Sequence, residues 1–364
     1  MESQTESSAV KDVRSASWEL IEFKIQGNDT VIYANGRMQV SVNIIVKAID
    51  SSNNTPYTLS ENTLAGIELV DYYNTGATLN GGWTYTKTEN EYAHVFPTGR
   101  SGEHDKDDRH DADRDDTGKI SFTGDDRSGI QTLRYWVSST KVESKNIGAR
   151  MQMPGGSWVN THSNQFDSQV TIRAATPVTY TMSNVTFDRQ DTANGKGWDQ
   201  DNYYLTTKVH AVKSTSIFAY KNENYNVVGM RQAISCHHRS KRNVYIQYMW
   251  PFGTQSTVQL GITHHEDGRP RSNPAPTVRI REQGGAMCFT RMWIENTDCN
   301  FSHDWWFEPY CIIYDTYGNS GQFNVHANHF QTISISDRNV SRSTEDDGKI
   351  HYGEKIVDEE IVED

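Results

Sequence analysis

The sequence predicts an all-β protein built from two tandem antiparallel β-sandwich domains of the Ig-like or jelly-roll-like kind. Three observations lead to this fold class. Apolar and polar residues alternate in short runs along most of the chain, which is typical of strands with one buried face. Aromatic residues make up 11% of the sequence, and large aromatic side chains favour strands over helices. At 364 residues the chain exceeds one ordinary core and fits two domains.

The first predicted strands follow a polar N-terminal arm whose composition is typical of disorder. Alternation begins in 18–26 and returns in 39–50. Between these runs, Asn35-Gly36 predicts a hairpin turn, because both positions tolerate positive φ. Further strands of the first domain are expected at 66–72, 132–138, 169–173 and 178–182.

The second half of the chain continues the alternation. Strands are expected at 203–209, 244–250, 258–262, 287–293, 312–314, 323–325 and 333–335. A polar stretch that contains glycine, 188–197, marks the region of the boundary. We therefore expect an N-terminal domain over 16–182, a C-terminal domain over 183–340, and an acidic tail over 341–364 that is disordered or docks as a short segment.

One strand of the first half resembles a known kind of domain. The run Gln39–Asp50 ends in a turn with Ser51, Ser52 and Asn53, and in this it is similar to bacterial Ig-like sandwiches of the adhesin type. The likeness covers a dozen residues and implies the sandwich fold alone.

Charge is concentrated in two segments. The formal net charge is −12, of which Glu345–Asp364 contributes −7 and His104–Asp116 contributes −4. The remaining body is close to neutral, so we expect no nucleic-acid partner. The cationic residues are expected to dock the acidic residues 358–364 of the same or a neighbouring chain. They are the basic stretch Arg239–Arg242 and the arginines Arg269, Arg271, Arg279 and Arg281.

The start of the chain contains no apolar run of the secretory type, and no stretch approaches the ~20 apolar residues of a membrane-spanning helix. We therefore expect synthesis in the cytoplasm and, if the protein acts outside the cell, release or export by a non-Sec route.

The Asp-rich loop 103–116 is the candidate metal site. Asp111, Asp113 and Asp115 stand at alternate positions and could present oxygen ligands to calcium from one side of an extended loop. The loop does not fit an EF-hand, because its sixth position counted from Asp111 is not glycine. The alternative is a solvated loop without a metal ion.

Aromatic clusters in the second half are the candidate binding residues. Alternation cannot bury every ring in one core, so we expect some to face a partner. The residues concerned are Trp250, Phe252, Trp305, Trp306, Phe307 and Tyr310.

No catalytic motif of convincing spacing is present, so the sequence favours recognition or self-assembly over catalysis. We expect a homo-oligomer, or a part of a larger assembly, that binds a protein or a glycan through its aromatic surfaces. Two alternatives remain open. One is a toxin that contacts membranes, with 203–216 as the inserting segment. The other is a carbohydrate-active enzyme that uses Asp304 and Glu308 as an acid pair.

Overall fold

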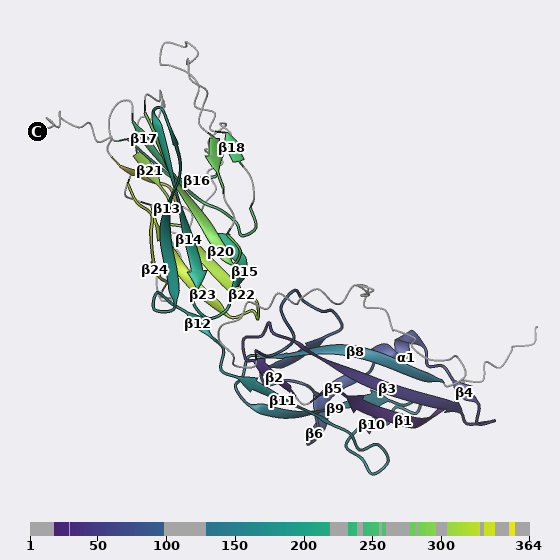
Figure 1. The fold of residues 1–364 in the computed structure, drawn as a ribbon. Coiled ribbons are helices and arrows are strands. Elements are labelled where there is room, and N and C mark those ends of the chain that lie inside the picture. Colours follow the sequence, from purple (N-terminus) through teal and green to yellow (C-terminus); the bar gives the residue numbers. More distant parts are fainter. Residues whose placement is uncertain are drawn as a thin grey trace, which may run out of the picture. The chain divides into compact units, whose positions relative to one another are not determined.

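The structure is a computed structural model that describes residues 18–28, 30–97, 129–218, 232–238, 243–254, 257–259, 277–280, 283–295, 304–327, 331–338 and 349–353. The described residues are almost all in strands or in the turns between them, which confirms the predicted all-β class (Figure 1). They belong to two compact units, unit 1 over 1–176 and unit 2 over 177–364. In the described part of the chain, no helix has the length and apolar character needed to cross a membrane.

The described residues of unit 1 form two sheets and one short helix, α1 (Glu61–Ala65). The first sheet has the order β1-β3-β8-β7, with β4 paired to β3, and its strands are β1 (Trp18–Gln26), β3 (Val40–Asp50), β4 (Pro56–Tyr57), β7 (Trp83–Thr86) and β8 (Ile130–Ser139). The second has the order β2-β11-β9-β5-β6, with β10 paired to β9, and its strands are β2 (Thr30–Tyr33), β5 (Glu68–Asp71), β6 (Asn74–Thr78), β9 (Ser144–Gln152), β10 (Trp158–Asn160) and β11 (Val170–Ala175).

Strand β3 shows how the sequence pattern builds the core of unit 1. Its residues Val42, Ile44, Val46 and Ala48 are fully buried, and the residues between them are only partly buried. This is the period of two that places successive side chains on opposite faces of a sheet. The helix α1 begins at the N-cap Ser60, whose side chain accepts a hydrogen bond from the backbone of Thr63.

The hairpin expected at Asn35-Gly36 is wrong, although the turn itself is present. Gly36 has a φ of +72°, and the Asn35 side chain accepts hydrogen bonds from the backbone nitrogens of Arg37 and Met38. The strands on either side of the turn do not pair with each other. β2 pairs with β11 in parallel, whereas β3 pairs with β1 and β8, so the turn carries the chain from one sheet to the other.

Unit 2 contains a seven-stranded sheet, which we call the central sheet. Its order is β13-β14-β20-β17-β16-β21-β25. The strands are β13 (Val185–Gly195), β14 (Trp198–Thr207), β16 (Ala233–His238), β17 (Val244–Met249), β20 (Ala286–Ile294), β21 (Asp304–Trp306) and β25 (His351–Gly353). β25 comes from the segment expected to be the acidic tail, and it pairs with β21.

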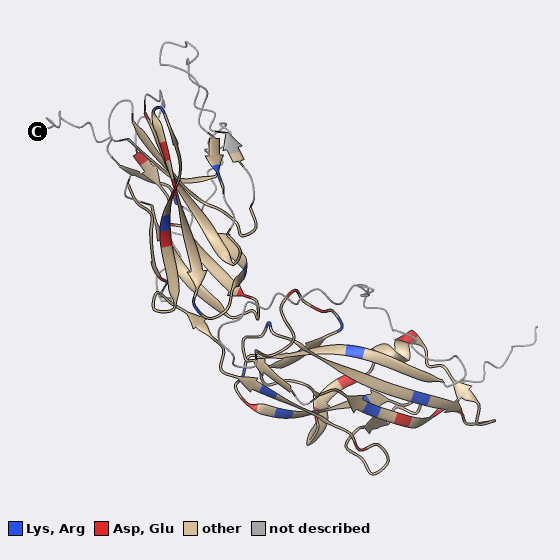
Figure 2. Cartoon of the chain, viewed as in Figure 1, with Lys and Arg blue, Asp and Glu red and all other residues tan. Residues whose placement is uncertain are grey.

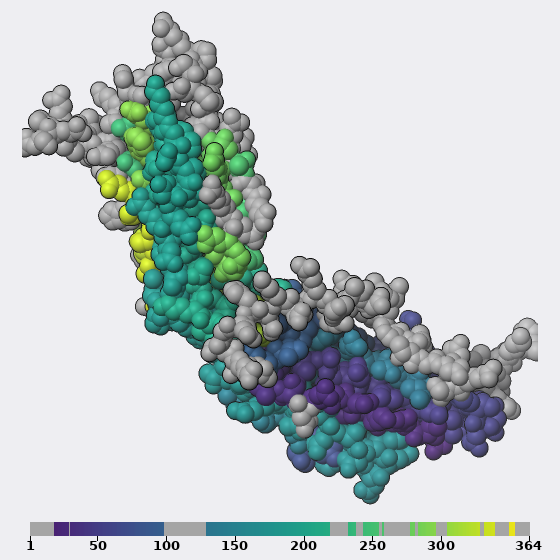
Figure 3. All heavy atoms as spheres, viewed as in Figure 1, coloured from purple at the N-terminus to yellow at the C-terminus, as the bar shows by residue number. Residues whose placement is uncertain are grey.

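A second sheet, the outer sheet, has the order β12-β23-β22-β15, with β24 paired to β23. Its strands are β12 (Thr179–Tyr180), β15 (Val212–Phe218), β22 (Tyr310–Asp315), β23 (Ser320–His326) and β24 (Ser334–Asp337). A separate pair is formed by β18 (Thr257–Gln259) and β19 (Thr277–Arg279). In the space-filling view the strands of each unit are closely packed (Figure 3).

The central sheet is covered on both faces. One face packs against the outer sheet through Phe289, Phe323 and their neighbours. The opposite face packs against Val278 of β19 and contains Trp250 and Trp305. The part of unit 2 that the structure describes therefore has two apolar cores, one on each side of the central sheet.

The membrane-inserting segment expected over 203–216 is not one strand. Its first part lies in β14, where Tyr203, Tyr204 and Leu205 are buried, and its last part lies in β15 of the outer sheet. The two parts therefore belong to different sheets, and the toxin alternative stays a prediction.

Candidate recognition surface

Three of the six predicted binding residues lie inside the protein. Trp250, Trp305 and Phe307 are 2%, 1% and 3% exposed, and all three belong to the core on the side of β19. The prediction that they face a partner is wrong, because it assumed one core per domain. The central sheet has a second core, and these rings fill it.

The other three residues are only partly buried. Trp306 is stacked between two histidine rings, with centroids 5.9 Å from His237 and 5.7 Å from His351. Phe252 packs against the core that faces the outer sheet. Tyr310 begins β22 of the outer sheet and points away from that core. A binding role for these three residues stays a prediction.

Alternation along the outer sheet separates its two faces. In β22, Cys311, Ile313 and Asp315 are buried, so Tyr310, Ile312 and Tyr314 lie on the opposite side. The antiparallel pairing with β15 and β23 sets Phe218 beside Tyr310, and Ser216, Ile312 and Gln322 in one row. We call the side of β15, β22, β23 and β24 that faces away from the core the outer face.

The ring of Tyr310 is held from both sides. The ring of Phe218 stacks on it with centroids 4.5 Å apart and an angle of 8°. The guanidinium group of Arg338 lies 3.6 Å from its centroid and also donates to Asn324 at 3.0 Å. Phe218 comes from the β15 side of Tyr310 and Arg338 follows β24 beyond β23, so the ring is fixed between an aromatic ring and a cation.

The outer face is almost neutral. By alternation, the described side chains of its four strands that point away from the core include no Asp or Glu. Asp337 of β24 is paired with the buried Phe323, so it belongs to the opposite side, where it accepts from the backbone nitrogen of Met182 at 2.8 Å. Charges elsewhere on the described strands are scattered and of both signs (Figure 2). The outer face also contains amides and hydroxyls, and His326 bonds to Ser336 at 2.8 Å. Its chemistry is therefore aromatic and polar, with Arg338 as its cation.

A buried carboxylate fixes the end of β22 below this face. Asp315 accepts hydrogen bonds from the Tyr180 hydroxyl at 2.7 Å, the backbone nitrogens of Tyr317 and Asn319 at 2.8 and 2.9 Å, and the Asn319 amide at 3.0 Å. The Asp315 side chain thereby joins β12 to the turn between β22 and β23. This arrangement explains how the start of β23 is positioned.

The acid pair expected for a carbohydrate-active enzyme is not assembled as predicted. Asp304 is buried, with its carboxylate 3.5 Å from Nδ1 of His237, whereas Glu308 is exposed. The two carboxyl groups therefore lie in different environments, which does not fit two acids that flank one sugar bond.

The described cysteines of unit 2 lie inside the protein. Cys236, Cys288 and Cys311 are all buried. Burial raises the pKa of the Cys311 thiol to about 12, which removes its nucleophilic form at neutral pH.

Several predicted features lie outside the described residues. They include Asp111, Asp113 and Asp115 of the calcium hypothesis, and both the basic stretch 239–242 and the acidic residues 358–364. The calcium site and the docking of the acidic segment stay predictions. Within the described residues, no group of three or more His, Cys, Asp or Glu side chains is placed to hold a metal ion.

The sequence interpretation missed Phe218 and Arg338, which hold Tyr310. The sequence did contain a signal for Phe218. Alternation places it on the same face of a strand as Ser214 and Ser216. Arg338 follows the last predicted strand, and nothing in the sequence places it beside Tyr310.

No protein family model matches this chain, and no curated protein matches it. Among solved structures it is similar to the adhesin InvE of Yersinia pseudotuberculosis, with 11% identity over 84% of this chain, 57% of that chain and a TM-score of 0.17. It is also similar to the C-terminal domain of the AgI/II polypeptide BspA of Streptococcus agalactiae, with 9% identity over 87% of this chain, 100% of that chain and a TM-score of 0.19. The chain thus spans little more than half the length of the Yersinia protein chain. At these TM-scores the likeness carries no inference about function.

Proposed function

We propose that this protein is a non-enzymatic recognition module that assembles with a second copy of itself through the outer face of unit 2. The observation that carries the proposal is the stack of Phe218, Tyr310 and Arg338 on a face without acidic residues in its described part.

The composition of the outer face supports a protein partner. Tyr, Phe and Arg are enriched where protein interfaces bury most area, and Asp, Glu and Lys are depleted there. Tyr310 is covered on both ring faces by Phe218 and Arg338, so a sugar ring cannot stack on it. Rings that are already fixed also lose little conformational freedom on binding.

The same composition supports a second copy as the partner. A symmetric dimer places one patch against the same patch of its copy. Amides and hydroxyls such as Gln322 and Ser216 both donate and accept hydrogen bonds, so each can pair with its counterpart. The described part of the face brings no carboxylates together, and Arg338 is already engaged by Asn324 and Tyr310.

The experiment is the mass of the full chain in solution by light scattering over a range of concentrations. The wild type is expected to reach twice the 41.4 kDa of one chain. The substitution Ile312→Asp places a charge in the middle of the outer face and is expected to give a monomer. The control is Ile21→Asp, at a 47% exposed position of β1 in unit 1, which leaves the mass unchanged.

A wild type that stays monomeric at about 0.1 mM, a concentration at which even weak specific dimers associate, would overturn the proposal. Equal loss of the dimer in both variants would overturn it as well, because the effect would then not belong to the outer face.

A further inference from the structure

The turn between β5 and β6 in unit 1 presents an exposed tyrosine that is nevertheless fixed. The Tyr73 residue is 70% exposed. Its hydroxyl accepts a hydrogen bond from the Asn146 amide at 3.3 Å, and its backbone nitrogen donates to the Asp71 carboxylate at 3.0 Å. The side chain is therefore held at its tip and at its base while water covers most of the ring.

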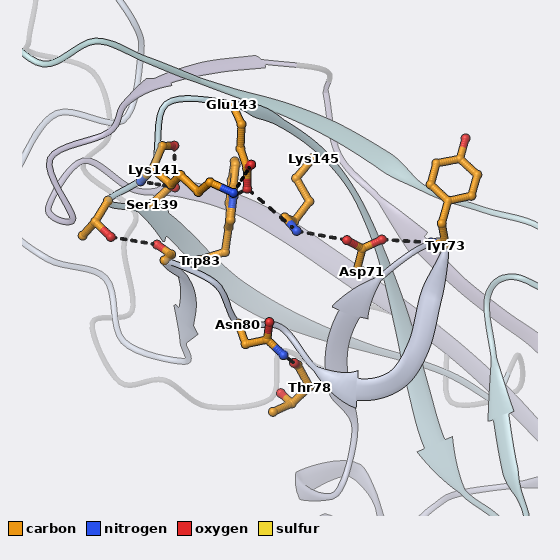
Figure 4. A network of polar contacts seen from close by, with 11 residues as sticks. Asp71, Tyr73, Thr78, Asn80, Trp83, Ser139, Lys141, Glu143 and Lys145 are labelled. Atoms are coloured by element: carbon orange, nitrogen blue, oxygen red, sulfur yellow. Dashed lines mark hydrogen bonds and ion pairs between the residues drawn. The ribbon is translucent and has the colours of Figure 1, made fainter.

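The attachment of Tyr73 continues into the body of unit 1 (Figure 4). Asp71 accepts from the Lys145 ammonium group at 2.9 Å, and Lys145 lies 3.9 Å from Glu143. Glu143 in turn accepts from the indole nitrogen of the buried Trp83 at 2.8 Å. Figure 4 shows the ring of Tyr73 directed away from this chain of contacts, which anchors the Tyr73 backbone.

Two further rings stand beside Tyr73. Tyr72 and His162 stack with centroids 4.3 Å apart, and the ring of Tyr73 is nearly perpendicular to both, at 5.1 Å and 5.8 Å. The Tyr72 hydroxyl donates to Asp167, a bond that raises the pKa of Tyr72 to about 12. Three rings and a carboxylate thus form one ordered cluster on the surface.

The polar groups around Tyr73 suit a ligand that has many hydroxyls and no charge. Asn146 offers an amide, while His162 and Asp167 are exposed and offer an imidazole and a carboxylate. Lys145 forms an ion pair with Asp71, so these two charges offset each other. The carboxylate of Asp167 then makes the site negative, which disfavours an anionic ligand. An exposed aromatic ring, in contrast, favours a ligand with an apolar face.

These requirements are met together by a pyranose, which has C–H groups on its ring face and hydroxyls around its edge. We propose that Tyr73, together with Asn146, His162 and Asp167, forms a binding site for a neutral saccharide. The sugar ring stacks on Tyr73, and its hydroxyls bond to the three polar side chains. The site lies in unit 1 and does not depend on the proposed assembly through the outer face.

The test uses the full chain and a panel of neutral methyl hexopyranosides and their disaccharides, with binding followed by ligand-detected NMR and calorimetry. Tyr73→Ala is expected to weaken binding at least about tenfold, because it removes the stacking ring. Tyr73→Phe keeps the ring and is expected to retain most of the affinity. Asn146→Ala keeps the ring, removes the amide, and is expected to weaken binding less than Tyr73→Ala.

The matched control is Trp158→Ala, which removes another exposed aromatic of unit 1, at 47% exposure, and leaves the site intact. This variant is expected to bind the saccharide as the wild type does. The light-scattering mass of each variant is expected to equal that of the wild type, which separates this site from the outer face.

Three results would overturn the proposal. The first is a wild type that binds no member of the panel at about 10 mM, the weak end of specific affinities. The second is an unchanged affinity in Tyr73→Ala, or an equal loss in Trp158→Ala. The third is binding of phosphocholine with no binding of any saccharide, since an aromatic cluster beside a carboxylate also suits a quaternary ammonium group.

Discussion

Removing the Asp315 carboxylate tests how unit 2 holds β12 and the start of β23 in place. Asp315→Ala takes away the acceptor of four hydrogen bonds, two of them from the buried side chains of Tyr180 and Asn319. Buried donors that lose their acceptor cost about 1–3 kcal/mol each. We therefore expect Asp315→Ala to lower the local free energy of unfolding by about 3–5 kcal/mol.

The partner variant separates the hydrogen bond from the packing. Tyr180→Phe removes one donor to a charged acceptor, which is worth about 1.5–3 kcal/mol. If the 2.7 Å hydrogen bond between Tyr180 and Asp315 supplies this energy, Tyr180→Phe lowers the stability only slightly in a protein that already has Asp315→Ala. The double-mutant cycle is then expected to give a coupling free energy of about 1–3 kcal/mol.

The assay is hydrogen exchange of peptides from β22 and β23, measured by mass spectrometry in increasing denaturant, because it reports unit 2 separately from unit 1. A decrease in the free energy of unfolding below about 1 kcal/mol for Asp315→Ala would refute the role of this carboxylate in joining β12 to the turn between β22 and β23. Additive effects of the two substitutions would refute it as well.

Three further predictions concern the cores and the acid response. Trp305→Ala removes a ring that is 1% exposed and is expected to lower the free energy of unfolding, measured in denaturant, by about 3–5 kcal/mol. Trp158→Ala is expected to lower it by less than about 1 kcal/mol, and similar losses in the two variants would contradict the burial of Trp305 in a core. Cys311 is expected not to react with a thiol reagent at pH 7.5 until the chain unfolds, and rapid labelling of the native protein would be inconsistent with its burial. The hydrogen bond from Lys141 holds the pKa of Glu143 below its ordinary value, so this carboxylate contributes stability above that value and loses it as the pH falls through the lower folded pKa. Glu143→Gln is thus expected to flatten the loss of stability in acid, as measured by urea unfolding at a series of pH values; an unchanged slope would rule this out.

Much of the strand pattern follows from alternation alone. β3 and β22 both show buried side chains at every second position, as a half-buried strand requires. The pairing of strands does not follow in the same way. The Asn35-Gly36 turn has the local chemistry of a hairpin, yet it joins strands of different sheets, because tertiary packing and not the turn decides which edges meet.

The sequence does contain a signal that Trp250 and Trp305 are buried. Strands with both faces buried are apolar on both alternating sets of residues. Ala286–Ile294 is such a run, with Met287 and Phe289 on one face and Cys288 and Met292 on the other. A strand of this kind indicates a sheet covered on both sides, and it would have placed Trp305 in a core.

The tyrosines at the centre of both proposals differ in how far the sequence identifies them. Tyr310 lies in an aromatic-rich segment and was expected to contact a partner, although Phe218 and Arg338 were not placed beside it. Tyr73 follows an ordinary strand ending, and the hydrogen bond to its hydroxyl comes from Asn146, which is distant in the sequence. Contacts of this kind are visible only once the fold is known.

Disulfide trapping across the outer face tests whether two copies of the protein assemble through this face. Ser216, Ile312 and Gln322 form one row across β15, β22 and β23, so single cysteines at these positions sample the middle of the face. In a symmetric dimer, residues near the axis meet their own copies, and two cysteines form a disulfide when their Cα atoms come within about 7 Å. We expect at least one of these variants to form a covalent dimer under mild oxidation, while the wild type and a variant with cysteine in place of Ile21 do not. Failure of all three to cross-link above those controls would contradict assembly through the outer face.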